Sequence, residues 1–167
     1  HQGARHNFIA RGAVYIEDCT FADGYFGNAG ATLFVCYENT PALTDAFTMV
    51  RCIVSNTNSP DTNVQAFLNH GAGVSGEFGS GTYIDCQAVD CAAGWSGGST
   101  EYVYTRCIAD GCSKAVTIAS PTQVSSFTEF QIINGTTGIE VNTGAQTLTL
   151  DGCDLNTTSG ALINLNP

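Results

Sequence analysis

The chain has 167 residues, of which 5 are Lys or Arg and 15 are Asp or Glu, so its formal net charge is −10. A phosphate backbone is repelled by this charge, which argues against a nucleic-acid partner. No apolar run approaches the roughly 20 residues of a membrane-spanning helix, and the first residues lack the pattern of a signal peptide. The length predicts one domain, residues 12–167, preceded by a lead-in at 1–11 and belonging to a longer polypeptide.

A short strand-like phrase that ends in cysteine recurs along the chain. Its cysteines are Cys19, Cys52, Cys86, Cys107 and Cys153. The run 127–132 is a cysteine-free copy, which leaves a period of about 21 to 24 residues with longer insertions at 23–45 and 56–81. This period is typical of a β-solenoid, in which each coil buries its apolar face against the next. We therefore predict an all-β fold, a parallel β-solenoid of about six coils.

Turn residues separate the strand phrases. Asp110-Gly111 and Asn134-Gly135 follow their strands closely, as expected where the backbone turns through a left-handed conformation. The first long insertion contains another strand-like run at 31–37. Insertions in consecutive coils usually project on one side of a solenoid and often carry the binding function.

The eight cysteines favour stacked thiols over disulfides. Five share one strand position, and Cys91 and Cys112 each follow a cysteine of that set by five residues. Thiols in register on neighbouring parallel strands are about 4.8 Å apart, but side chains that point the same way rarely reach the dihedral angle of a disulfide. No Cys-x-x-Cys or Cys-x-x-His spacing occurs, and His1, His6 and His70 are isolated, so we predict no metal and no other cofactor.

Alternation along a strand decides which side chains face the core. If the cysteines point inward, small and β-branched residues on the same side of each strand also face the core. If the cysteines point outward, four charged residues are buried instead, at a cost of several kcal/mol each. The predicted inward residues are Thr48, Val50, Val54, Thr82, Ile84, Ala88, Val103, Thr105 and Ala109. On this choice Glu17 and Asp151 also fall inward, at the two ends.

The same choice predicts the outer surface. The residues before four successive cysteines alternate in charge and form what we call the charge ladder: Asp18, Arg51, Asp85 and Arg106. Opposite charges on neighbouring strands attract, so the ladder could simply pair strands. Two apolar stripes are predicted beside it: Ile16, Met49, Tyr83 and Tyr104, and Thr20, Ile53, Gln87 and Ile108. A contiguous exposed stripe indicates a surface that contacts a sugar polymer or another subunit.

The strand phrases, the inward Cys/Val/Ile/Ala column, the Asn- and Asp-containing turns and the uneven loops resemble the right-handed parallel β-helix of the pectin-lyase-like superfamily over residues 12–165. The low lysine content and the Thr- and Gly-rich coils are most similar to a bacteriophage or viral tailspike or fibre segment. The resemblance implies a receptor-binding or structural part of a virion, outside the cell, forming a homotrimer or contacting other virion proteins. Its expected ligand is a cell-surface polysaccharide.

The superfamily also contains glycoside hydrolases and polysaccharide lyases, so a polysaccharide-degrading enzyme is the alternative. The run Tyr25–Ala29 resembles a stretch of pectin methylesterases, but the Gln-Asp catalytic elements of that family are missing. Whether the chain is an enzyme is left open by the sequence.

Candidate binding residues combine flat rings with polar groups, which suits sugar rings. They are Tyr83, Asp85, Tyr104 and Arg106 on one outer face, and Trp95 in a glycine-rich segment, 94–98, interpreted as a turn. For Trp95 the alternative is packing of that segment over the solenoid.

Candidate catalytic residues are Asp85, Asp90, Asp110 and Arg106. Hydrolysis of a glycoside needs two carboxyl groups about 5 to 9.5 Å apart, which carboxylates on adjacent or alternate coils can provide. A lyase instead needs a cation against a uronate, for which Arg51 and Arg106 are the candidates. The alternative role of Asp90 and Asp110 is turn formation.

Overall fold

The computed structural model describes residues 6–11, 14–22, 32–38, 47–57, 64–71, 80–97, 101–118, 124–141 and 147–165. Every regular element in these residues is a β-strand, from β1 (His6–Arg11) to β19 (Ile163–Leu165). No helix long and apolar enough to cross a membrane occurs in the described residues.

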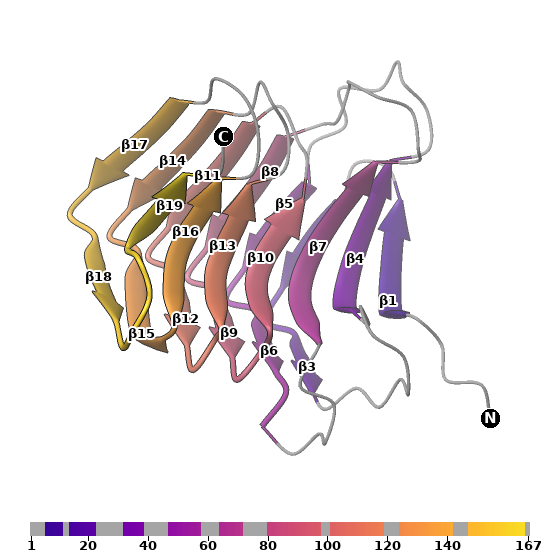
Figure 1. Cartoon of the computed structure of the whole chain (residues 1–167). Helices are drawn as coiled ribbons and strands as arrows, with labels where there is room; N and C mark the ends of the chain where they lie inside the picture. Colours follow the sequence, from indigo (N-terminus) through magenta and orange to yellow (C-terminus); the bar gives the residue numbers. More distant parts are fainter. Residues whose placement is uncertain are drawn as a thin grey trace.

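The strands form three parallel sheets, which the chain visits in turn (Figure 1). Sheet A has seven strands in the described residues: β1, β4 (Thr32–Glu38), β7 (Gln65–Gly71), β10 (Ala93–Gly97), β13 (Lys114–Ile118), β16 (Thr137–Val141) and β19. Sheet B has six: β2 (Val14–Glu17), β5 (Phe47–Val50), β8 (Ser80–Ile84), β11 (Glu101–Thr105), β14 (Val124–Thr128) and β17 (Thr147–Asp151). Sheet C also has six: β3 (Thr20–Ala22), β6 (Ile53–Ser55), β9 (Gln87–Val89), β12 (Ile108–Asp110), β15 (Gln131–Gly135) and β18 (Asp154–Thr157).

This arrangement confirms the predicted parallel β-solenoid; the number of coils and their handedness stay predictions. The strand-like run at 31–37 is β4, as expected. Two assignments differ from the sequence analysis. His6–Arg11, assigned to the lead-in, form β1 and pair with β4 in sheet A. The glycine-rich segment around Trp95 is not a turn, because it forms β10 between β7 and β13.

A single residue with left-handed backbone joins each described strand of sheet B to the next strand of sheet C. The φ angles at these corners are 55° at Asp18, 50° at Arg51, 54° at Asp85, 52° at Arg106, 53° at Glu129 and 61° at Gly152. The corners between sheets C and A repeat this feature, with φ of 66° at Gly111 and 55° at Asn134, as the turn dipeptides predicted. A lone left-handed residue bends the chain sharply while strands continue on both sides.

The corner corrects the predicted inward face of sheet B. After the corner the prediction is confirmed, because the cysteines just before β6, β9 and β12 and the residues two positions after each cysteine are buried: Cys52, Cys86, Cys107, Val54, Ala88 and Ala109. Before the corner it is wrong for most positions: Tyr83 and Tyr104 are buried, whereas Thr82 and Ile84 are half-buried on the other side of the strand. The half-buried residues also include Thr48, Val103 and Thr105, and Glu17 and Asp151 are exposed. At the corners of Asp85 and Arg106 the left-handed residue and its predecessor both lie outside the core, so the alternation shifts by one residue there.

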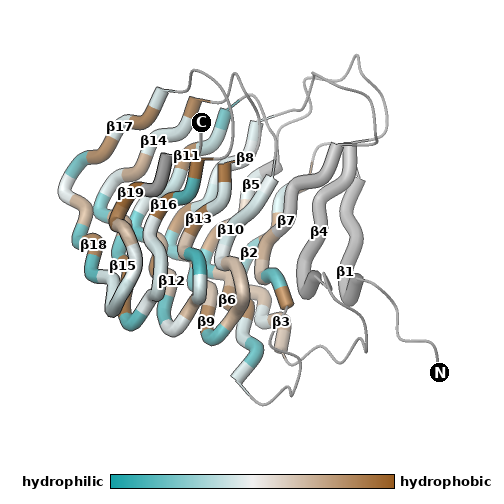
Figure 2. The backbone as a smooth tube through the Cα atoms, in the orientation of Figure 1, coloured by the Kyte–Doolittle hydropathy of each residue, from teal (hydrophilic) through white to brown (hydrophobic). Residues whose placement is uncertain are grey.

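Aromatic rings fill the core at the centre of the stack. Tyr104 stacks on Tyr83 with ring centroids 5.4 Å apart and on Phe127 at 4.7 Å. Trp95 stacks on Phe67 at 5.2 Å and meets the edge of Tyr83 at 6.0 Å. Hydrophobic and hydrophilic residues alternate along the strands of the stack (Figure 2). Stacked and edge-to-face pairs of this kind each contribute about 0.5 to 1.5 kcal/mol beyond the area that they bury.

Candidate functional site

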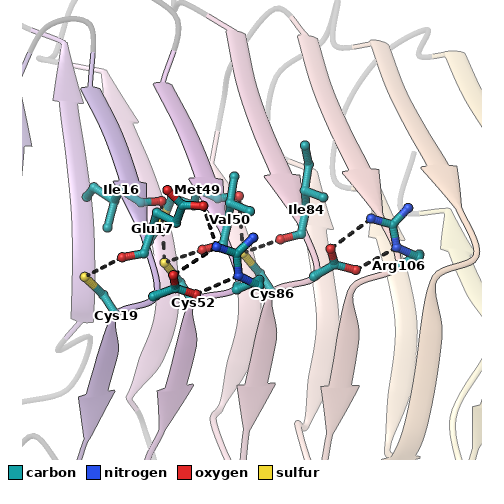
Figure 3. A network of polar contacts seen from close by, with 12 residues as sticks. Ile16, Glu17, Cys19, Met49, Val50, Cys52, Ile84, Cys86 and Arg106 are labelled. Atoms are coloured by element: carbon teal, nitrogen blue, oxygen red, sulfur yellow. Dashed lines mark hydrogen bonds and ion pairs between the residues drawn. The ribbon is translucent and has the colours of Figure 1, made fainter.

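The charge ladder lies on the outside of the corner between sheets B and C. Arg51 donates from Nε to Asp18 Oδ1 at 2.6 Å and from Nη2 to Asp18 Oδ2 at 2.9 Å, and its Nη2 also pairs with Glu17. Arg106 donates to Asp85 in the same bidentate way (Figure 3). The left-handed corner turns each of these side chains outward, one coil above the next. The predicted outward ladder is therefore confirmed.

The ion pairs change the acidity of their members. The hydrogen bond from Arg106 holds the pKa of Asp85 below its ordinary value, and the hydrogen bond from Arg51 does the same for Asp18. An aspartate with a lowered pKa is ionised at neutral pH, so Asp85 is poorly suited to act as the general acid of a glycosidase. The guanidinium of Arg106 faces Asp85, whereas in a lyase it would have to face the uronate of the substrate.

Asp90 and Asp110 lie near each other at the corner between sheets C and A, as predicted. The backbone N–H of Asp90 donates to the carbonyl of Asp110 at 2.8 Å. The Asp90 carboxylate accepts a hydrogen bond from Thr57 Oγ1 at 2.9 Å, and that of Asp110 accepts one from Asn134 Nδ2 at 3.1 Å. Asp90 also covers Gly111, where an added Cβ would lie 2.2 Å from Asp90 Oδ1. These contacts are those of turn residues.

The predicted aromatic part of the binding surface is not on the surface. Tyr83 and Tyr104 are 2% exposed and Trp95 is 1% exposed, because all three rings belong to the core. Of the five candidate binding residues, only Asp85 and Arg106 reach the outside, with half of the Arg106 side chain exposed. A sugar ring has no access to the buried rings, and burial raises the pKa of Tyr104 well above its ordinary value.

The five cysteines of the recurring phrase are free thiols stacked along the solenoid, as predicted (Figure 3). Cys86 Sγ donates to the carbonyl of Met49 on the previous coil at 3.4 Å, and Cys107 Sγ donates to that of Tyr83 at 3.4 Å. Burial raises the pKa of Cys52 to about 11 and also raises that of Cys107. The thiols of Cys52 and Cys107 are therefore inert at neutral pH, since the thiolate is the reactive form.

No group of three or more His, Cys, Asp or Glu within the described residues is placed to hold a metal ion. His1, the side chains of His6 and His70, and the run Tyr25–Ala29 lie outside the described part of the chain.

A regular outward face on sheet B was missed by the sequence analysis. It consists of two columns of half-buried residues, which we call the sheet B face: Thr48, Thr82, Val103 and Ser126 in one column, and Ile84, Thr105 and Thr128 in the other. Members of a column are in register on neighbouring strands, about 4.8 Å apart. None of the seven is charged, and all but Ser126 are β-branched. The signal was the run of Thr, Val and Ile residues one and three positions before the corner residues, which the wrong alternation assigned to the core.

Comparison of the chain with protein-family models, with curated proteins and with solved structures finds no match.

Proposed function

We propose that this chain is a receptor-binding segment of a virion tailspike or fibre, of the pectin-lyase-like type, and that it binds a cell-surface polysaccharide. On this proposal it acts outside the cell, as part of a homotrimer or together with other virion proteins. The stack of parallel sheets supports the proposal, because a solenoid is an extended scaffold that presents the same outer surface on coil after coil.

The observation that carries the proposal is the regular outer surface of sheet B and its adjoining corner. Hydroxyl and methyl groups recur there about every 4.8 Å along the stack, and the Asp85–Arg106 pair lies at the edge. A polysaccharide also repeats along its length, so equivalent groups of ligand and protein can meet on several coils at once. Many weak contacts of this kind add up to useful affinity through multivalency.

Binding rather than cleavage is proposed because the candidate catalytic carboxylates already have protein partners. Asp85 is paired with Arg106, Asp90 with Thr57 and Asp110 with Asn134. A general acid or nucleophile must instead face the substrate. The Asp85–Arg106 pair links neighbouring strands, and the contacts of Asp90 and Asp110 are those of turn residues.

The test is affinity electrophoresis of the purified protein through gels that contain single polysaccharides, with parallel assays for reducing ends and for unsaturated ends. Retardation without release of either product is the expected result. If the assays detect a released product, and Asp90→Asn or Asp110→Asn abolishes its release, the chain is a polysaccharide-degrading enzyme and this proposal is wrong. Sedimentation velocity of the same sample measures the expected trimer.

A further inference from the structure

The charges of the outer surface restrict the kind of polysaccharide that can bind. Three basic side chains are described by the structure, and each has an acidic partner: Arg51 pairs with Asp18, Arg106 with Asp85, and Lys114 Nζ lies 2.8 Å from Glu140 Oε2. An anionic polysaccharide needs unpaired cations for charge-assisted hydrogen bonds. To bind here it would have to break an existing ion pair, and it would also approach a chain of net charge −10.

The sheet B face has the chemistry that an uncharged sugar chain requires. Thr82, Thr105 and Ser126 present hydroxyl groups that bond to no other side chain in the described residues. Val103, between Thr82 and Ser126 in its column, and Ile84, next to Thr105, present apolar surface. Sugar rings have apolar C–H faces and hydroxyl rims, so methyl groups and hydroxyl groups in alternation match both.

We propose that the polysaccharide bound by this chain is uncharged and that it lies on the sheet B face; this inference rests on the proposed function. The ligand contacts the hydroxyl groups of neighbouring coils in succession. The net charge of −10 and exposed carboxylates such as Asp151, at one end of sheet B, repel uronates and sialates from the same surface.

The size of the face argues for a polymer rather than a protein partner. Four strands at about 4.8 Å and about four residues along each strand give roughly 19 by 13 Å, or about 250 Å². A stable protein interface needs about 800 Å² on each side, with aromatic or Arg anchors that these seven residues do not include. A polysaccharide chain is narrow and needs no such area.

The experiment measures binding to dextran, mannan and galactan as uncharged probes and to polygalacturonate, alginate and hyaluronate as anionic probes. Thr105→Glu places a charge at the centre of the face. Its matched control is Gln131→Glu, at an exposed position of sheet C. Thr105→Val is the second variant, because it keeps the β-branched shape and removes only the hydroxyl group. Circular dichroism and thermal unfolding establish that each variant is folded.

We expect at least one uncharged probe to bind, with a loss of about tenfold or more in Thr105→Glu, a loss of a few-fold in Thr105→Val and no loss in Gln131→Glu. The affinity should be nearly independent of salt, because no ion pair forms with the ligand. An uncharged probe that binds all variants equally would overturn the location and leave the proposed function standing. Salt-dependent binding of anionic probes alone, weakened by Arg106→Gln, would overturn the ligand class. Binding of no probe would overturn the proposed function as well.

Discussion

The guanidinium of Arg106 donates two parallel hydrogen bonds to the carboxylate of Asp85, from Nε to Oδ1 at 2.7 Å and from Nη2 to Oδ2 at 2.8 Å. The two residues are 21 positions apart in the sequence and occupy equivalent left-handed corners of neighbouring coils. The pair is exposed, so its free-energy contribution is small, but its geometry links two coils on the outside of the stack.

Arg106→Gln should raise the pKa of Asp85 toward its ordinary value of 3.8. Because the folded-state pKa is lowered by Arg106, the pair stabilises the protein above about pH 4, and this stabilisation is lost as the pH falls through the folded pKa. The measurement is the pH titration of the Asp85 carboxyl carbon by NMR in both proteins. An unchanged titration would show that the pair does not persist in solution.

Cys86→Ser should lower the free energy of unfolding by about 1 to 3 kcal/mol, because a more polar hydroxyl group enters an apolar column. The hydroxyl group can still reach the carbonyls of Met49 and Ile84, which keeps the loss below that of an unsatisfied donor. Cys153→Ser is the control, since Cys153 is only half-buried. Urea unfolding of the three proteins gives the comparison, and equal losses in both variants would contradict a buried column at Cys86.

Gly111→Ala should destabilise the protein more than Gly152→Ala. Both glycines have left-handed backbone, with φ of 66° and 61°, so both variants carry a backbone penalty of about 1 to 2 kcal/mol. At Gly111 the new Cβ would lie 2.2 Å from Asp90 Oδ1, whereas at Gly152 its nearest neighbour is Glu129 Cγ at 3.5 Å. The difference between the melting temperatures of the two variants measures the cost of the steric clash with Asp90, because the backbone penalty is common to both. The same melting temperature in both would mean that Asp90 does not cover Gly111.

Trp95→Ala should cost about 3 to 5 kcal/mol of stability, because it removes a large ring from the core and leaves a cavity. Trp95→Phe should cost less than half of that, since it keeps the stacking contact with Phe67. Denaturant unfolding measures both, and fluorescence of the native protein should show the blue-shifted emission of a buried indole. A Trp95→Ala variant as stable as the parent would show that Trp95 is not buried in the core.

The recurring phrase was sufficient to predict the stacked parallel strands, the inward cysteines and the outward charge ladder. These features follow from periodicity, because equivalent residues of successive coils must meet side by side in a solenoid. The charges added a second constraint, since Arg51 and Asp85 could not be buried together at acceptable cost. Both arguments concern the cysteine and its immediate neighbours, and there the prediction is confirmed.

Which face of sheet B is buried was decided by the tertiary structure. The left-handed residues Asp85 and Arg106 leave two consecutive side chains outside the core at their corners, so Tyr83 and Tyr104 point into the core and Thr82 and Ile84 point away from it. Asp and Arg at such a corner look no different in the sequence from Asp and Arg in an extended strand. Trp95 likewise required the pairing of β10 with β7 and β13, because its glycine-rich surroundings resemble a turn until neighbouring strands supply backbone hydrogen bonds on both sides.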